Sequence, residues 1–273
     1  MRFLRKYAFV VLVPLAVLLL SSFHLGAWGQ TPSTIQRQVV EYSQGGQLLE
    51  GYLAFDSAQT GPRPGVMVVH EWKGINDYTR RRADQLAEMG YIAFAADIYG
   101  KGIRPQTNDE AREQATLYRS NRPLLRDRAN AGLNLLRNHP LSDNNRLAAI
   151  GYCFGGTTVL ELARSGADLE GAVSFHGNLD TPNPQDAEQI QAKVLVLHGA
   201  DDPLVPDTQV AAFQKEMRDA QVDWQLIAYG GAVHSFTNPD AGNDPSQGSA
   251  YNAEADRRSW EHMKQFFAEV FPD

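Results

Sequence analysis

The chain has 273 residues, enough for one large domain or two small ones. With 43% hydrophobic and 21% charged residues, its composition is that of an ordinary globular protein and excludes a disordered or collagen-like chain. The formal net charge of −7 excludes the basic footprint of a nucleic-acid-binding protein. A single cysteine excludes an intrachain disulfide and a cysteine-rich zinc site.

Residues 1–29 have the pattern of a secretory signal peptide. Three basic residues among the first six precede an apolar stretch over 7–20, shorter than the roughly 20 residues that cross a bilayer. Small residues within 27–29 then offer a cleavage site before Gln30. We therefore expect an exported protein, periplasmic or secreted, without stable membrane contact after cleavage. An uncleaved membrane anchor is the alternative.

The rest of the chain, 30–273, alternates between short apolar runs and helix-like segments. Turn residues at 45–46 predict an antiparallel hairpin over 39–55. The strands predicted after it are 66–70, 91–98, 147–152, 169–175, 194–198 and 224–229. The predicted helices are 79–89, two within 108–138 separated near Pro123, 155–165, 207–220 and 250–270. This alternation predicts a single α/β domain with a mostly parallel central sheet and helices on both faces.

Active sites in such sheets form beyond the carboxyl ends of the strands, so the candidate site residues are those that follow each strand. After 147–152, the sequence Gly-Tyr-Cys-Phe-Gly-Gly at 151–156 leads into a helix. This pattern is typical of a nucleophile elbow, with Cys153 where serine is commoner. The helix N-terminus directs backbone N–H groups at the sulfur, which favours a thiolate. The alternative is a small buried cysteine behind a glycine-rich helix start.

A catalytic triad on this fold continues with an acid and then a histidine. Asp202, or Asp201 beside it, follows the strand 194–198 and could orient an imidazole. His234 follows the strand 224–229 on a predicted loop, where it could act as a general base. Each residue alone could be a turn carboxylate or a surface histidine. Their order after successive strands favours a Cys–His–Asp triad.

The sequence resembles the dienelactone hydrolase family of α/β-hydrolases over nearly the whole chain after the signal. The resemblance rests on Gly-x-Cys-x-Gly-Gly at 151–156, Asp-x-x-Val-Pro at 202–206, His-Ser-Phe at 234–236, His-Glu-Trp-Lys-Gly at 70–74 and Asp-Ile-Tyr-Gly at 97–100. It implies the α/β-hydrolase fold and cleavage of a small ester or lactone. It also selects Asp202 over Asp201 as the acid. The zinc helix motif is excluded because position 74 lacks its second histidine, and we expect no metal or other cofactor.

The resemblance also gives Glu71 the role of gating the thiol. A carboxylate beside Cys153 can accept its hydrogen bond and hold the thiol neutral until substrate displaces the carboxylate. The alternative is a solvated loop carboxylate. The backbone N–H groups of Phe154 and Trp72 are the expected oxyanion hole, and Trp72 could also form a pocket wall. His176 falls at a strand end as well, but we assign it no role.

The residues for substrate recognition depart from the family. Two arginines hold the substrate carboxylate in dienelactone hydrolases proper, and they align here with Lys101 and Asn238. Lysine lacks the arginine fork and asparagine is neutral, so these two residues do not reproduce the carboxylate site of the family. Arg104 and Tyr99 complete the residues expected to bind substrate. We expect a monomeric hydrolase. The alternatives are a peptidase or an acyltransferase with the same triad, or a non-catalytic binding protein on this scaffold.

Overall fold

An antiparallel hairpin opens the part of the chain that the computed structural model describes, residues 33–272. Strands β1 (Ile35–Gln44) and β2 (Gln47–Asp56) pair over their whole length. The two glycines between them both have positive φ, a conformation that glycine adopts without steric cost. This confirms the predicted hairpin. The predicted signal peptide, 1–29, lies outside the described residues.

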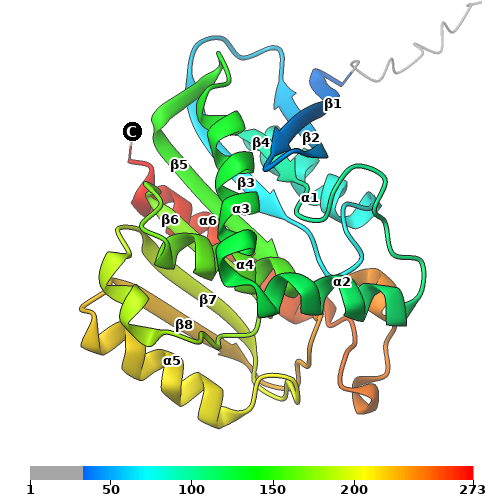
Figure 1. Cartoon of the computed structure of the whole chain (residues 1–273), viewed down its shortest axis with the longest axis vertical. Helices are drawn as coiled ribbons and strands as arrows, with labels where there is room; N and C mark the ends of the chain where they lie inside the picture. Colours follow the sequence, from blue (N-terminus) through cyan, green and yellow to red (C-terminus); the bar gives the residue numbers. More distant parts are fainter. Residues whose placement is uncertain (1–32, 273) are drawn as a thin grey trace, which may run out of the picture. The chain divides into compact units, whose positions relative to one another are not determined.

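Six further strands extend the hairpin into an eight-stranded sheet (Figure 1). They are β3 (Arg63–Val69), β4 (Ile92–Ala96), β5 (Ser142–Tyr152), β6 (Gly171–Phe175), β7 (Lys193–Gly199) and β8 (Trp224–Tyr229). The strand order is β1-β2-β4-β3-β5-β6-β7-β8, and the pairs from β4 through β8 are all parallel. Strands β4 and β6 are buried at every residue, which explains why they form continuous apolar runs in the sequence. The predicted mostly parallel sheet is confirmed.

Helices join these strands and cover the sheet. They are α1 (Asp77–Glu88), α2 (Asn108–Ser120), α3 (Arg122–Arg137), α4 (Phe154–Arg164), α5 (Asp207–Asp219) and α6 (Ala253–Val270). Side chains of α1 and α6 share one apolar cluster with the sheet, and those of α3 and α4 share another. The sheet is therefore covered on both faces. No helix within residues 33–272 has the length and apolar character needed to span a membrane.

The predicted break between α2 and α3 has a local cause. Pro123 occupies the first turn of α3, where its missing N–H removes no helical hydrogen bond. The Asn121 side chain accepts a hydrogen bond from the Leu124 amide and caps the new helix. Residues 108–138 therefore form two helices, and α2 is free to lie against the carboxyl edge of the sheet (Figure 1).

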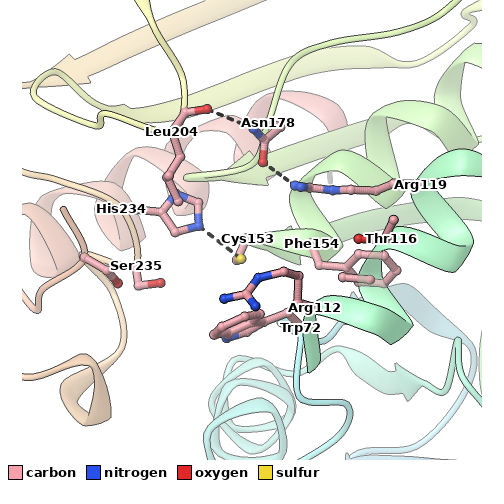
Figure 2. A pocket seen from close by; sticks show the side chains of 12 residues that line it. Trp72, Arg112, Thr116, Arg119, Cys153, Phe154, Asn178, Leu204, His234 and Ser235 are labelled. Carbon is pink, nitrogen blue, oxygen red and sulfur yellow. Dashed lines mark hydrogen bonds between the residues drawn. The ribbon is translucent and has the colours of Figure 1, made fainter. Parts of the chain in front are cut away.

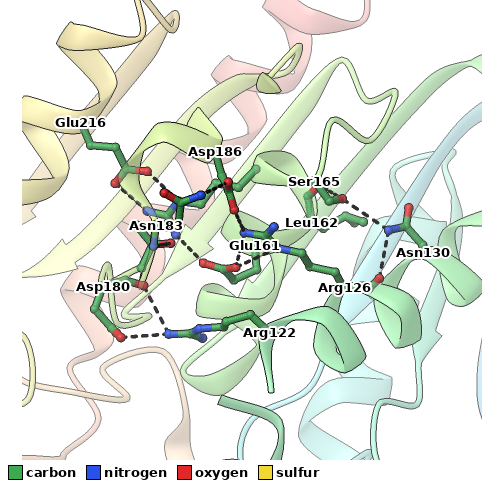
Figure 3. A network of polar contacts seen from close by, with 12 residues as sticks. Arg122, Arg126, Asn130, Glu161, Leu162, Ser165, Asp180, Asn183, Asp186 and Glu216 are labelled. Atoms are coloured by element: carbon green, nitrogen blue, oxygen red, sulfur yellow. Dashed lines mark hydrogen bonds and ion pairs between the residues drawn. The ribbon is translucent and has the colours of Figure 1, made fainter. Parts of the chain in front are cut away.

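The C-terminal end of α4 lies in a buried ionic network (Figure 3). Arg164 and Glu161 are both fully buried. Arg164 donates to both carboxylate oxygens of Glu216 on α5, at 2.7 and 2.8 Å, and to Glu161 at 3.0 Å. Arg126 on α3 pairs with Glu161 at 2.8 Å and with Asp186 at 2.6 Å. The network therefore ties α4 to two neighbouring helices.

Candidate active site

The turn between β5 and α4 presents Cys153 in a strained conformation, with φ 54° and ψ −113°. Residues other than glycine rarely adopt positive φ, and such strain is commonest at functional sites. The neighbouring glycines are required by space. A Cβ at Gly151 would lie 2.0 Å from the Gly155 carbonyl oxygen, and one at Gly155 would lie 2.2 Å from that of Val69. The backbone therefore has the form of the predicted nucleophile elbow.

The Cys153 thiol, His234 and Asp202 meet at the carboxyl edge of the sheet. His234 Nε2 lies 3.0 Å from the Cys153 sulfur (Figure 2). Its Nδ1 lies 2.8 Å from Asp202 Oδ2. The His234 and Asp202 residues are each 4% exposed. Asp201 is exposed and accepts a hydrogen bond from the Gly231 amide instead. The geometry therefore pairs His234 with Asp202, as the sequence comparison with the family implied.

The electrostatic surroundings of His234 favour its charged form. Burial opposes the charge, but the sulfur of Cys153 and the carboxylate of Asp202 outweigh it. Together they raise the pKa of His234 to about 10. An imidazolium beside the sulfur stabilises a thiolate, which is the nucleophilic form of cysteine. The arrangement can therefore supply a nucleophile and a proton donor at one place.

Glu71 lies on the loop that follows β3, and the neighbouring His70 fixes this loop. The buried His70 ring donates from Nδ1 to the Glu71 carbonyl oxygen at 2.6 Å and accepts from the Ile98 amide at 3.3 Å. The Glu71 carboxylate is buried and accepts a hydrogen bond from the Asn238 amide at 2.5 Å. Burial raises the pKa of Glu71, while Asn238 and the His234 charge oppose this. The thiol contacts His234 in this structure, not the Glu71 carboxylate.

The two expected oxyanion-hole residues both line the cavity in front of Cys153 (Figure 2). Phe154 is the first residue of α4, where a backbone N–H has no acceptor within the helix. Trp72 lies on the same loop as Glu71, and its carbonyl oxygen accepts a hydrogen bond from the Tyr99 hydroxyl at 3.0 Å. This contact holds the loop beside the elbow. Trp72 also forms a wall of the cavity, as expected.

The cavity has a volume of about 310 Å³. Its lining residues are Trp72, Arg112, Ala115, Thr116, Arg119, Cys153, Phe154, Asn178, Leu204, His234, Ser235 and Ser249. Four of these come from one face of α2, which sequence analysis did not connect with the site. Their spacing of three or four residues is the only signal of this face in the sequence. Within residues 33–272, no group of His, Cys, Asp or Glu side chains is arranged to hold a metal ion.

Two of the four residues expected to bind substrate form ion pairs outside the cavity. Lys101 does not line the cavity, because its exposed ammonium pairs with Glu41 on β1. The Arg104 guanidinium lies 3.5 Å from the buried Asp97 and donates to the Ile103 carbonyl oxygen at 2.8 Å. It also lies outside the lining. These contacts stabilise the segment after β4, and substrate binding by either residue stays a prediction.

Tyr99 and Asn238 are also outside the cavity lining. Tyr99 is buried, and its hydroxyl is already bonded to the Trp72 carbonyl oxygen. Asn238 is buried against Glu71, at the position where the family resemblance places an arginine. Both residues contact residues of the site, but neither side chain lines the cavity. Their contacts orient the loop that carries Glu71 and Trp72.

His176, to which the sequence assigned no role, lies directly behind the nucleophile. Its Nδ1 accepts a hydrogen bond from the Cys153 backbone N–H at 3.1 Å, so Nε2 carries the proton of the neutral ring. That Nε2 donates to the Thr237 hydroxyl at 2.7 Å, and this hydroxyl lies 2.6 Å from the Tyr78 hydroxyl. The ring also packs edge-on against the His234 ring, with centroids 5.5 Å apart. Burial lowers the pKa of His176 well below its usual value, and the His234 charge lowers it further.

The chain is similar to known proteins over most of its length. The model of the dienelactone hydrolase family matches residues 49–271. The chain belongs to the dienelactone hydrolase family. It is thus an ester or lactone hydrolase with the α/β-hydrolase fold, and the resemblance noted in the sequence is confirmed.

The relatives within this family differ in their named activities. A structure named m3DLH is 43% identical with a TM-score of 0.84, covering 87% of this chain and 99% of its own. A dienelactone hydrolase-like promiscuous phosphotriesterase, P91, from metagenomic libraries is also 43% identical, with a TM-score of 0.83 and the same coverage. A Bradyrhizobium protein named as a probable 2-oxo-3-(5-oxofuran-2-ylidene)propanoate lactonase is 31% identical, over 74% of this chain and 85% of its own.

Proposed function

We propose that this family member is an exported enzyme that cleaves an ester or lactone through an acyl-enzyme on Cys153. The observation that carries the proposal is the continuous line of contacts from sulfur to imidazole to carboxylate. The two distances of 3.0 and 2.8 Å are those of hydrogen bonds, and the sulfur opens onto the cavity. The names of the relatives, a lactonase and a dienelactone hydrolase-like enzyme among them, support this substrate class.

The reaction follows from these positions. The Cys153 thiolate attacks the carbonyl carbon, and the negative charge moves to the carbonyl oxygen. The backbone N–H groups of Phe154 and Trp72 stabilise that oxyanion. The tetrahedral intermediate collapses when the carbon–oxygen bond to the leaving alcohol breaks, and His234 gives that oxygen its proton. Asp202 keeps the imidazole oriented and stabilises its charge.

Deacylation uses the same groups in reverse. A water molecule enters, His234 removes its proton, and the resulting hydroxide attacks the thioester carbon. The second tetrahedral intermediate then releases the acid and returns the thiolate to the imidazolium. An amine or an alcohol could take the place of water, which would make the product an amide or a new ester.

The proposal is tested with a panel of esters, lactones and thioesters on the purified protein. We expect turnover of at least one class, and mass spectrometry of a rapidly quenched reaction should show the acyl group on Cys153. Amine acceptors added to the same reactions separate hydrolysis from acyl transfer. If folded Cys153→Ala hydrolyses the best substrate at the wild-type rate, the assigned mechanism is wrong.

The gating role of Glu71 is part of the proposal and has its own test. If the Glu71 carboxylate holds the resting thiol neutral, Glu71→Gln should make Cys153 more reactive toward iodoacetamide below about pH 8. The measurement is the alkylation rate against pH, with wild type as the reference. A variant that reacts more slowly at every pH would show that Glu71 activates the thiol.

Export is also part of the proposal, and the first 29 residues support it. Mass spectrometry of the protein from its native host should show a new N-terminus near Gln30. A mature soluble chain that still begins at Met1 in the cytosolic fraction would contradict export.

Phosphotriester hydrolysis is a second candidate activity. Its support is the 43% identity to the promiscuous phosphotriesterase P91 over 87% of this chain. Attack of the thiolate on phosphorus would place the phosphoryl oxygen where the carbonyl oxygen of an ester lies. Adding paraoxon to the panel tests this, and Cys153→Ala should abolish any release of nitrophenolate.

A further inference from the structure

Strand β1 leaves one edge of the sheet open. It is the outermost strand, and within residues 33–272 it pairs with β2 alone (Figure 1). The residues at 36–39 are all exposed, and Val39, at 61%, is more exposed than any other large hydrophobic residue that the structure describes. Strand β1 runs for ten residues without a proline and in unbroken register with β2. A long, regular edge of this kind is a template for pairing with a further strand.

The hydrogen bonds of the hairpin determine which backbone groups of β1 point outward. The Glu50 N–H on β2 donates to Asp97 at 3.0 Å, on the side of β2 away from β1. Glu50 lies opposite Glu41, and two opposite residues of an antiparallel pair either both face each other or both face away. The backbone groups of Glu41 therefore point away from β2, and the period of two residues gives Arg37 and Val39 the same direction. Within residues 33–272, these outward N–H and C=O groups have no hydrogen-bond partner.

The residues along this edge are complementary to a second copy of themselves. Arg37 and Glu41 lie two positions before and after Val39, so all three side chains are on one face of β1. If a second β1 pairs antiparallel with Val39 opposite Val39, each Arg37 lies opposite a Glu41 of the other copy. A shift by two residues loses both of these ion pairs. Arg37 already contacts Asp84, and Glu41 contacts Lys101, but the Arg37 and Glu41 side chains remain 44% and 50% exposed.

We propose that two copies of this chain pair through their β1 strands, antiparallel and in this register, and form one continuous sheet across a two-fold axis. Each outward residue exchanges two backbone hydrogen bonds with the residue opposite it, and the opposite charges on one face fix the register. The partner is a second copy because the charges of β1 complement β1 itself. The contact uses no residue of the cavity or of the proposed triad, so it is independent of the proposed function. It differs from the monomer expected from the sequence, because only the folded hairpin shows β1 as an open edge.

Sedimentation equilibrium tests the contact on the protein in the form that its native host produces. A single pair of strands is smaller than a standard interface of about 1,600 Å², so we expect a reversible dimer with a Kd of about 1–50 μM. Arg37→Glu and Glu41→Arg each place like charges opposite each other and should weaken the dimer by about tenfold or more. The double variant restores opposite charges and should return the Kd to within about threefold of wild type. Arg257→Glu makes the same charge change at an exposed position on α6 and should leave the Kd unchanged.

Substitutions of Val39 test the backbone contact and its register. Val39→Pro removes an outward N–H that β2 does not use, so it should weaken the dimer by about tenfold or more, whereas Val39→Thr keeps this N–H and should stay within about threefold. In a Cys153→Ala background, Val39→Cys should form a disulfide between copies, because the two Cα atoms would lie about 5.5 Å apart. Ser43→Cys should not, because in this register its two copies lie roughly 27 Å apart. Thermal unfolding shows that each variant is folded.

Three results would overturn the proposal. A wild-type chain that stays monomeric up to about 200 μM would leave this edge to solvent or to a strand of another protein. A dimer that none of the β1 variants weakens would place the contact on another surface. A disulfide that forms as readily in Ser43→Cys as in Val39→Cys, or a charge-swapped double variant that stays monomeric, would exclude the register.

Discussion

Helix α4 begins and ends in opposite kinds of surroundings. At its N-terminus, Cys153 has a strained backbone and faces a cavity. At its C-terminus, Arg164 and Glu161 are fully buried and satisfied by ion pairs with α3 and α5. One end holds groups whose partners must change during a reaction, and the other holds groups whose partners should never change. The comparison indicates that stability is built at the end of the helix farther from the chemistry.

The largest expected effect is on catalysis and arises at the N-terminal end. Cys153→Ala and His234→Ala should each lower kcat by about 10⁴- to 10⁶-fold, because each removes a member of the same proton-transfer unit. The double variant should lose little more than either single variant. Steady-state kinetics on the best ester measures this. Additive losses would mean that the two residues act independently and would contradict the triad.

The next effect is on stability and arises at the C-terminal end. Arg164→Met leaves Glu216 buried without its cation and leaves Glu161 with Arg126 alone, which should lower the free energy of unfolding by about 3–5 kcal/mol. The activity of the folded variant should stay within about twofold of wild type. Urea unfolding provides the measurement. The control is Lys215→Met, which removes an exposed ion pair on α5 and should cost less than about 1 kcal/mol. Equal losses in both variants would contradict the special role of the buried network.

As the pH falls, the free energy of unfolding should decrease because of His70, before acid disrupts the ionic network at the C-terminal end of α4. Burial lowers the pKa of His70 to about 4, so the folded protein keeps this ring neutral while the unfolded chain protonates it near pH 6.5. Stability from His70 is therefore complete above pH 6.5 and is lost as pH falls toward 4, by about 2–3 kcal/mol. Glu216 acts in the opposite direction, because burial raises its pKa and its contribution is lost as pH rises. Urea unfolding between pH 7 and 4 should show a shallower dependence in His70→Gln than in wild type.

A smaller catalytic effect should separate the two contacts of His176. In His176→Asn the side-chain oxygen can still accept the Cys153 N–H, whereas His176→Gln better reproduces the donor to Thr237. If His176 positions the nucleophile, Gln should lower kcat by about 10- to 100-fold and Asn by clearly less. The pH profile of Cys153 alkylation provides a second readout, because displacement of the His234 ring changes its contact with sulfur. Equal kcat and unchanged profiles in both variants would leave His176 with a packing role alone.

The smallest expected effect is on stability and arises from the backbone strain at the nucleophile elbow. Cys153→Gly removes the side chain whose backbone is held at φ 54°. Because glycine adopts positive φ freely, this variant should be more stable than Cys153→Ala by about 1 kcal/mol, although both are inactive. Thermal unfolding of the pair measures the difference. An alanine variant as stable as the glycine variant would show that the turn stores no strain.

The order of the elements and the positions of the three residues of the proposed triad could be predicted from the sequence for the same reason. Parallel strands are local apolar runs, and the chemistry follows each run directly, so Cys153, Asp202 and His234 could be located without knowing how the helices pack. Arg119 could not, because α2 lies at the carboxyl edge only through its packing on α3 and the neighbouring loops. Its sequence separation from Cys153 carries no sign of their nearness.

The position of Lys101 outside the cavity lining has the same physical origin. Lys101 follows a strand, as Cys153, Asp202 and His234 do, but its charge is paired with Glu41 on the hairpin, which lies beside it only in the folded chain. The buried network at the end of α4 was also not predicted. Arg126, Glu161 and Glu216 are far apart in the sequence, and each alone has the pattern of a solvent-exposed helical residue.

The single thiol has a consequence for how the protein withstands oxidants. Cys153 is the one cysteine among 273 residues, and it is partly exposed at the cavity. A sulfenic acid formed there has no second thiol in the chain with which to form a disulfide. Reduction of this sulfenic acid therefore requires a thiol that is small enough to enter a cavity of about 310 Å³. Without such a thiol, further oxidation gives an acid that cannot be reduced back to the thiol. The residue that makes the site reactive thus also determines how long the enzyme stays active, because that time depends on the reductants around it.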